Sequence, residues 1–129
     1  SVRDYFIAQS DSQFCPAFDI VGSVTVSKKL ANYGGNSGGK DKADGTLAGE
    51  AIDSAVAHGV DFNKYVTEGN KVPFVAIVYA GYGEQVNGEY PNAVWAQYLY
   101  TLGHKNGGKT FSTALPYLTS ASPVARLRN

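Results

Sequence analysis

Residues 75 to 79, Val-Ala-Ile-Val-Tyr, form the densest apolar run of the chain and lead directly into residues 80 to 84, Ala-Gly-Tyr-Gly-Glu. The run is short, rich in β-branched side chains, and apolar at both odd and even positions. This pattern is typical of a strand covered on both faces. We therefore predict a central strand from Val72 to Ala80. Gly81 and Gly83 free the backbone where this strand ends, and an open α/β sheet usually places its site there.

The clearest helical pattern covers Gly45 to His58. Asp44 is a suitable N-cap and Gly59 a suitable stop, while His58 in the last turn suits the negative end of the helix dipole better than a metal role. A shorter helix is predicted for residues 2 to 9, with Ser1 as its N-cap. The apolar stripe of the longer helix consists of Leu47, Ala48, Ala51, Ile52, Ala55 and Val56.

Four further segments have readable patterns. Phe18 to Ser27 alternates with the period of a half-buried strand, and Asn32 to Asp44 has the Gly, Asn, Ser and Asp content of a loop that is either functional or mobile, mobility being favoured. Ala93 to Leu102 fits a strand or a helix, and we favour the strand. Asn106-Gly107-Gly108-Lys109 predicts a hairpin turn, with Phe111 to Leu118 pairing back across it.

These elements predict an α/β fold, with an α+β arrangement as the alternative: a mixed sheet with two or more helices. The 129 residues fit one domain or part of one, with a core at about residues 1 to 103 and a poorly ordered tail at 119 to 129. Lys plus Arg number 11 and Asp plus Glu number 11, which argues against a nucleic-acid partner. No apolar stretch is long enough for a membrane span. Cys15 stands alone among aromatic residues and is predicted to be a small packed hydrophobe.

The order of the motifs resembles one family, the secreted zinc metallopeptidases of the immune inhibitor A type. Their catalytic domains carry a strand ending in Tyr-Ala-Gly-x-Gly-Glu, then a Gly-rich loop and an Ile-Trp-Pro-His segment, and residues 72 to 98 read VPFVAIVYAGYGEQVNGEYPNAVWAQY. Upstream, residues 1 to 6, 18 to 24 and 33 to 36 are similar to the family's first helix, the strand after it and its glycine loop. The match covers roughly residues 1 to 100.

The resemblance implies the N-terminal, sheet-bearing half of a zincin-type domain, a polypeptide substrate, and secretion or a cell-envelope location. It also implies zinc as the cofactor of the intact enzyme. The chain has no signal peptide and no initiating Met, so we expect a processed or excised segment of a longer protein.

The chain departs from the family where the chemistry is performed. The family binds zinc through H-E-x-x-H, but His58 and His104 stand far apart and neither belongs to such a motif. In the family the zinc helix follows the matched region, so we predict no zinc ligand and no catalytic residue in this chain. Residues 66 to 71 lack the family's run of Asp, so calcium is not expected there, and residues 94 to 97 have lost the Pro and the His.

The end of the central strand therefore supplies the candidate site. For Glu84 a structural role is favoured over substrate orientation, because no partner carboxylate is identified; pairing with Glu89 as in a glycosidase has little support. Aromatic residues around this loop either form a recognition surface or cap the sheet edge, with equal weight. The candidates for a cleft wall or substrate contact are Gly81, Tyr82, Gly83, Glu84 and Trp95.

Two functions follow from these observations. The first is a portion of a secreted zinc metallo-endopeptidase-like catalytic domain that supplies sheet and cleft wall and is inactive by itself. The alternative is a non-catalytic binding or scaffold module derived from the same fold. An H-E-x-x-H motif downstream of Asn129 in the parent reading frame would distinguish them.

Overall fold

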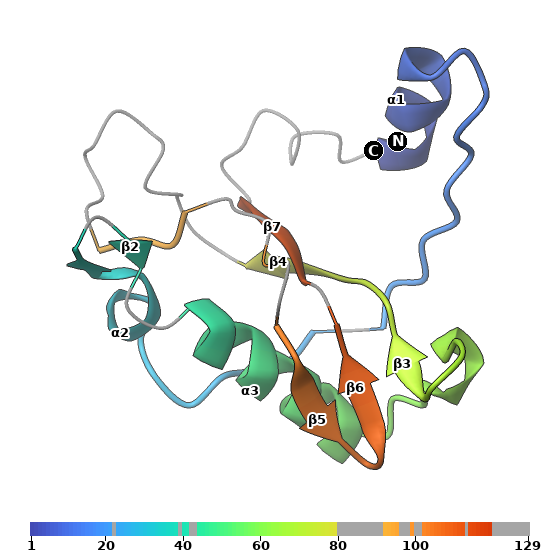
Figure 1. Ribbon diagram of the computed structural model, residues 1–129. Coiled ribbons are helices and arrows are strands. Elements are labelled where there is room, and N and C mark those ends of the chain that lie inside the picture. The colour runs from blue at the N-terminus through green and yellow to red at the C-terminus, as the bar shows by residue number, and fades with distance from the viewer. Residues whose placement is uncertain are drawn as a thin grey trace.

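The structure is a computed structural model that describes residues 1–21, 23–38, 40–41, 44–79, 92–95, 99, 102–112 and 114–119. Figure 1 shows helices and short strands arranged around the long helix α3. The helical elements are α1 (Val2–Gln9), α2 (Ala31–Gly34), α3 (Asp44–Ala57) and the 3-10 turn η1 (Asn63–Tyr65). The strands are β1 (Asn36–Ser37), β2 (Lys40–Asp41), β3 (Lys71–Val72), β4 (Val75–Tyr79), β5 (His104–Asn106), β6 (Lys109–Phe111) and β7 (Ala114–Thr119).

The strands form three small groups. β1 pairs with β2 as an antiparallel hairpin, and β4 pairs with β7 in parallel. The third group is a mixed sheet in the order β3-β6-β5, in which β3 is parallel to β6 and β5 is antiparallel to it. Helices combined with a small mixed sheet agree with the predicted α/β class.

Helix α3 is the organising element, and the helix predicted from Gly45 to His58 is confirmed with its bounds shifted by one residue. Asp44 is the first residue of the helix rather than its N-cap. Five of the six residues of its predicted apolar stripe are buried, whereas Val56 is 36% exposed. Ile52 and Ala55 form one core cluster with Phe62, Val72 and Phe111. The helix ends in a Schellman motif, because the Gly59 amide donates to Val56 O and the Val60 amide donates to Ala55 O. Gly59 has φ +87, a left-handed conformation that glycine adopts without a steric penalty. A second cluster contains Tyr33, Leu47 and Val94.

The predicted central strand is wrong in two respects. First, Val72 to Ala80 is divided: Val72 pairs with Phe111 in the mixed sheet, whereas Val75 pairs with Ala114, and the residues between them belong to neither strand. Pro73 lies at this break and lacks an amide hydrogen for a ladder. Second, β4 is not covered on both faces, because Val78 is 64% exposed. Strand β4 is rich in β-branched residues and pairs in parallel with β7, but among the described residues only one of its faces is half-buried.

The predicted strand from Phe18 to Ser27 is also wrong, since the described part of that range contains no strand. Val24 and Val26 do turn toward the two core clusters, as the alternation requires. Ile20, by contrast, is 94% exposed. Only the second half of the segment packs against the core. Its side chains alternate between core and solvent there, although no described strand is hydrogen-bonded to it.

Other predictions have mixed outcomes. Helix α1 is confirmed, with a capping box between Ser1 and Asp4. The hairpin turn is confirmed between β5 and β6, and Gly107 and Gly108 have φ +56 and +76, as a type I′ turn requires. Phe111 pairs back across this turn, but β7 joins β4 instead.

Three further segments complete the description. The predicted loop from Asn32 to Asp44 contains the end of α2 and the β1–β2 hairpin. Cys15 is exposed rather than packed, and its thiol donates a 3.4 Å hydrogen bond to Ser12 O. The tail from 120 to 129 and half of the residues from Ala93 to Leu102 lie outside the described residues. None of the described helices has the length and apolar character needed to cross a bilayer.

Candidate functional site

The candidate site begins where β4 ends. The Tyr79 hydroxyl donates a 2.7 Å hydrogen bond to Val94 O, which fastens residues 92 to 95 beside the carboxyl end of β4. Val94 is fully buried, and Trp95 immediately after it is 42% exposed. Trp95 is thus placed beside the strand end that the sequence predicted to be the site. The other predicted site residues, Gly81, Tyr82, Gly83 and Glu84, lie outside the described residues.

Close backbone packing between Gly34 and residues 93 and 94 also helps to fix the position of Trp95. A Cβ built on Gly34, at the end of α2, would lie 2.2 Å from Ala93 O and 2.7 Å from the Val94 amide nitrogen. Only glycine permits this approach, because no real Cβ comes so near to a backbone atom. The glycine run that starts at Gly34 therefore begins with a packing contact that helps to hold Val94 and the residue after it.

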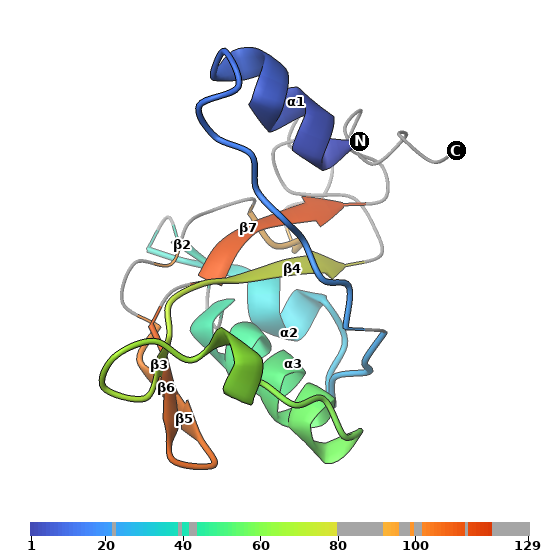
Figure 2. The same ribbon diagram turned by 90° about the vertical axis from the view of Figure 1, so that its right-hand side faces the viewer.

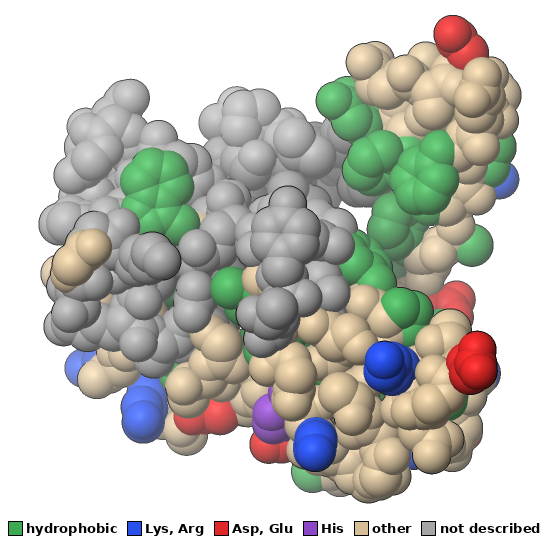
Figure 3. Space-filling view, in the orientation of Figure 1, with side chains coloured by type: hydrophobic (Ala, Val, Ile, Leu, Met, Phe, Trp, Pro, Cys, Tyr) green, Lys and Arg blue, Asp and Glu red, His purple; other side chains and the backbone are tan. Residues whose placement is uncertain are grey.

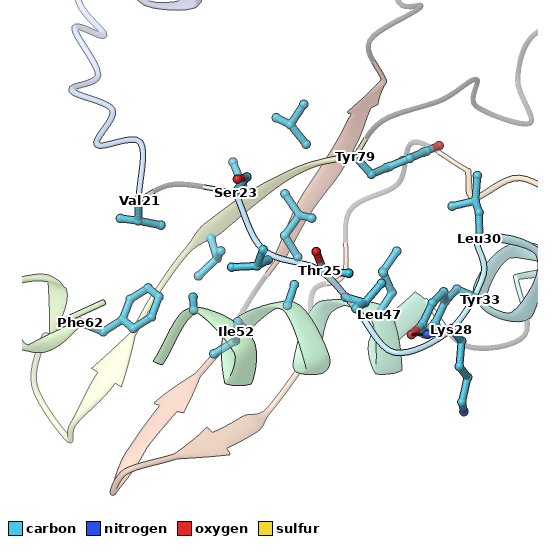
Figure 4. Close-up of a pocket in the computed structure, with 18 residues that line it drawn as sticks. Val21, Ser23, Thr25, Lys28, Leu30, Tyr33, Leu47, Ile52, Phe62 and Tyr79 are labelled. Atoms are coloured by element: carbon cyan, nitrogen blue, oxygen red, sulfur yellow. Dashed lines mark hydrogen bonds between the residues drawn. The ribbon is translucent and has the colours of Figure 1, made fainter. Parts of the chain in front are cut away.

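An apolar cavity of about 530 Å³ lies between residues 21 to 30, helix α3 and strand β4. Figure 4 shows its wall: Ile52 and Leu47 project from α3, Phe62 closes one end, and Tyr79 stands at the other. The volume falls within the range of small-molecule sites, about 300–1,000 Å³. Its polar groups do not converge on one point, so the cavity suits an apolar group better than a chemical step.

A carboxylate-centred cluster fixes the wall of this cavity. Glu50 Oε2 accepts hydrogen bonds from the Tyr33 hydroxyl at 2.6 Å, the Ser27 hydroxyl at 2.8 Å and the Ser27 amide at 3.2 Å. The Lys28 amide in turn donates to the Tyr33 hydroxyl at 3.1 Å. These donors, the Tyr33 hydroxyl first and Ser27 second, lower the pKa of Glu50 below its usual value. The arrangement is a brace between the chain at residue 27, α2 and α3.

A second polar cluster joins α3 to the β5–β6 hairpin. Asp53 Oδ1 lies 2.7 Å from His104 Nε2 and accepts a 2.6 Å hydrogen bond from the Asn106 side chain. The hydrogen bond with His104, followed by that from Asn106, lowers the pKa of Asp53. A Cβ on Gly49 would lie 2.8 Å from His104 Nδ1, so this ring nitrogen faces the helix backbone. An Asp–His pair that serves a nucleophile needs its outer nitrogen free, so this pair is a clasp rather than a catalytic dyad.

Neither histidine stands in a zinc-binding arrangement. His58 Nδ1 lies 2.7 Å from Ser54 O, one turn back on α3, in agreement with the predicted role at the helix end. Within the part of the chain that the structure describes, no three His, Cys, Asp or Glu side chains gather closely enough to hold a metal ion. The described residues therefore do not fit the zinc that the family resemblance implies.

The two polar clusters were missed by reasoning from sequence. Tyr33 and Glu50 are 17 positions apart, and Asp53 and His104 are 51 apart. Glu50 and Asp53 lie within the predicted helix from Gly45 to His58 but outside its apolar stripe. Nothing local in the sequence indicates which distant donors they would meet.

No protein-family model, curated protein or solved structure matches this chain. The resemblance to the immune inhibitor A type rests on the motif order in the sequence alone.

Proposed function

We propose that this chain is part of the catalytic domain of a secreted zinc metallo-endopeptidase of the immune inhibitor A type, in which it supplies sheet and cleft wall. The observation that carries the proposal is the motif order around β4: Tyr-Ala-Gly-x-Gly-Glu at residues 79 to 84, a Gly-containing loop, and Trp95. The hydrogen bond from Tyr79 to Val94 supports it, because it sets the first and last parts of this series side by side.

In this proposal the chain's own residues bind and position, and they do not perform the chemical step. Trp95 would form part of the wall against which an extended polypeptide lies, and the Tyr79–Val94 bond would hold that wall. Bound zinc in such enzymes acts as a Lewis acid and activates water. Its ligands and the general base would have to come from outside the described residues, because the described ones hold no such set.

The first experiment concerns the parent protein. Its reading frame beyond Asn129 is examined for H-E-x-x-H, and the purified parent is assayed for zinc content and for casein cleavage. The proposal expects one zinc per chain and a chelator-sensitive cleavage activity. A parent with no such motif, no zinc and no cleavage would eliminate the proposal and leave the non-catalytic binding or scaffold module.

A matched pair of variants of the same parent tests the cleft wall. Trp95→Ala should lower kcat/KM for a peptide substrate by about tenfold or more, through the lost aromatic contact, with zinc content unchanged. Phe74→Ala is the control, because Phe74 is similarly exposed but precedes β4, at the opposite end of the strand from Tyr79. Equal effects of the two substitutions would show that Trp95 does not contact substrate.

A further inference from the structure

Among the described residues, strand β4 is covered on only one of its faces. Val75 and Ile77 turn toward the core clusters, whereas Ala76 and Val78 turn away and are exposed. Parallel strands occur almost only where both faces of the sheet are covered. The outer face of β4, defined by Ala76 and Val78, is therefore an apolar surface that the described residues leave exposed.

The first 18 residues form a small unit of their own, here called the N-terminal unit. The Phe6 ring packs edge-on against Phe14 with centroids 5.5 Å apart, and Phe18 lies 6.4 Å away from Phe6. Tyr5 is 59% exposed, and Phe14 is also exposed. On the face shown in Figure 3, the hydrophobic side chains of this unit gather on the side turned toward the rest of the molecule. An eight-residue helix with so little cover is marginal by itself.

The two apolar surfaces belong to the same side of the molecule. In Figures 1 and 2, α1 and α3 lie on opposite sides of the β4–β7 pair. Residues 19 to 23 connect the N-terminal unit to Val24, which packs on the core. Five extended residues span up to about 17 Å, so the unit can move by the width of a helix. Asp19 is tied to the body only by exposed contacts with Tyr65 and Lys64, and such contacts are weak.

We propose that the N-terminal unit docks onto the outer face of β4, with its Phe6–Phe14–Phe18 cluster against Ala76 and Val78. Docking covers the second face of the parallel pair and removes exposed aromatic surface from water. It also explains the exposure of Ile20, which lies in the connecting residues that change path when the unit moves. The partner of this surface is thus a segment of the same chain.

Cys15 provides the first test, because it is the one cysteine of the chain and is exposed beside Phe14. In Val78→Cys, oxidation should form a disulfide within one chain between Cys15 and the introduced thiol, since docking brings the two positions within bridging distance. Val56→Cys, on the exposed side of α3, is the control and should cross-link at least about tenfold more slowly. Equal rates in the two variants would overturn the proposal. Disulfides found only between chains would point to docking on a second copy and would overturn it equally.

Hydrogen exchange gives a second test that needs no new cysteine. The amides of residues 5 to 9 in α1 should exchange at least about tenfold faster in Val78→Asp than in the parent chain, because a carboxylate on the outer face prevents docking. Val56→Asp should leave these rates unchanged. If α1 exchanges at the same rate in the parent and in Val78→Asp, the unit does not dock on β4.

Discussion

The Tyr33 hydroxyl donates a 2.6 Å hydrogen bond to Glu50 Oε2, joining a buried tyrosine of α2 to a carboxylate of α3. Tyr33 is only 1% exposed, so its hydroxyl has little access to water. It donates to Glu50 and accepts a hydrogen bond from the Lys28 amide. The Ser27 amide and hydroxyl share the same carboxylate oxygen. One ionised group therefore organises three segments of backbone.

This relationship predicts a pH dependence of stability. The pKa of Glu50 is lower in the folded chain than its usual value of 4.5, mainly because of the hydrogen bond from the Tyr33 hydroxyl. Its contribution is therefore complete above the unfolded pKa and is lost as pH falls through the folded one. Glu50→Gln should be less stable than the parent at about pH 6 to 7, with the difference shrinking below about pH 4. Denaturant melts across this range measure it, and Glu68→Gln, in the exposed turn before β3, is the control. A difference independent of pH would contradict the ionic brace.

The glycine at the end of α2 predicts a large steric effect. Gly34→Ala should destabilise the chain by about 2 kcal/mol or more, because its Cβ would meet the Ala93 carbonyl and the backbone has to shift. Gly45→Ala, in the first turn of α3, has nothing within 4 Å of its Cβ and should stabilise by about 0.5 kcal/mol through helix propensity. Chemical denaturation of both variants checks the contrast. Equal stabilities would mean that α2 does not pack on residues 93 and 94 as described.

Helix α3 offers a matched pair for the core. Ile52 is fully buried in the larger cluster, so Ile52→Ala should cost about 2–5 kcal/mol. Val56, four residues later on the same helix, lies at the boundary with solvent, and Val56→Ala should change the free energy of unfolding by less than about 1 kcal/mol. Urea titrations of the two variants give the comparison. Similar costs would show that the apolar stripe is rotated from the position described.

The clasp between α3 and the hairpin should be real but weak. Asp53 is about half exposed, so a double-mutant cycle of Asp53→Ala and His104→Ala should give a coupling free energy of about 0.2–1 kcal/mol. The coupling should fall at high salt, because exposed charge pairs are screened. Stability measured for the parent, the two single variants and the double variant completes the cycle. A coupling free energy of zero would show that the contact with Asp53 does not stabilise the chain, and that His104 contributes only by packing on Gly49.

What could be predicted from the sequence was local. The stripe of α3, its stop at Gly59 and the turn at Gly107 each depend on a few neighbouring residues, so a pattern of three to four positions was enough. The α1 cap at Ser1 is of the same kind. All of these predictions are confirmed.

What failed depends on distant partners. The alternation in Phe18 to Ser27 correctly turns Val24 and Val26 inward, but a strand exists only when another strand pairs with it, and no local pattern supplies the partner. Val78 belongs to a dense apolar run, yet it is 64% exposed, because its burial depends on which segment covers β4. Of the site, Trp95 is placed beside the end of β4, while the residues from 80 to 84 stay a prediction.

The strand registers have a consequence for how this chain folds. Val75 pairs with Ala114 and Lys71 pairs with Thr110, so the parallel ladders join positions 39 residues apart, and 40 apart after the register shift in β4. The entropy of closing such loops is lost before any ladder contact compensates it, which makes parallel pairings of this separation slow to form. During synthesis, α3 can form as soon as it emerges, but β3 and β4 have to wait for residues 109 to 119. A nascent chain that stops short of them would expose the edges of both strands together.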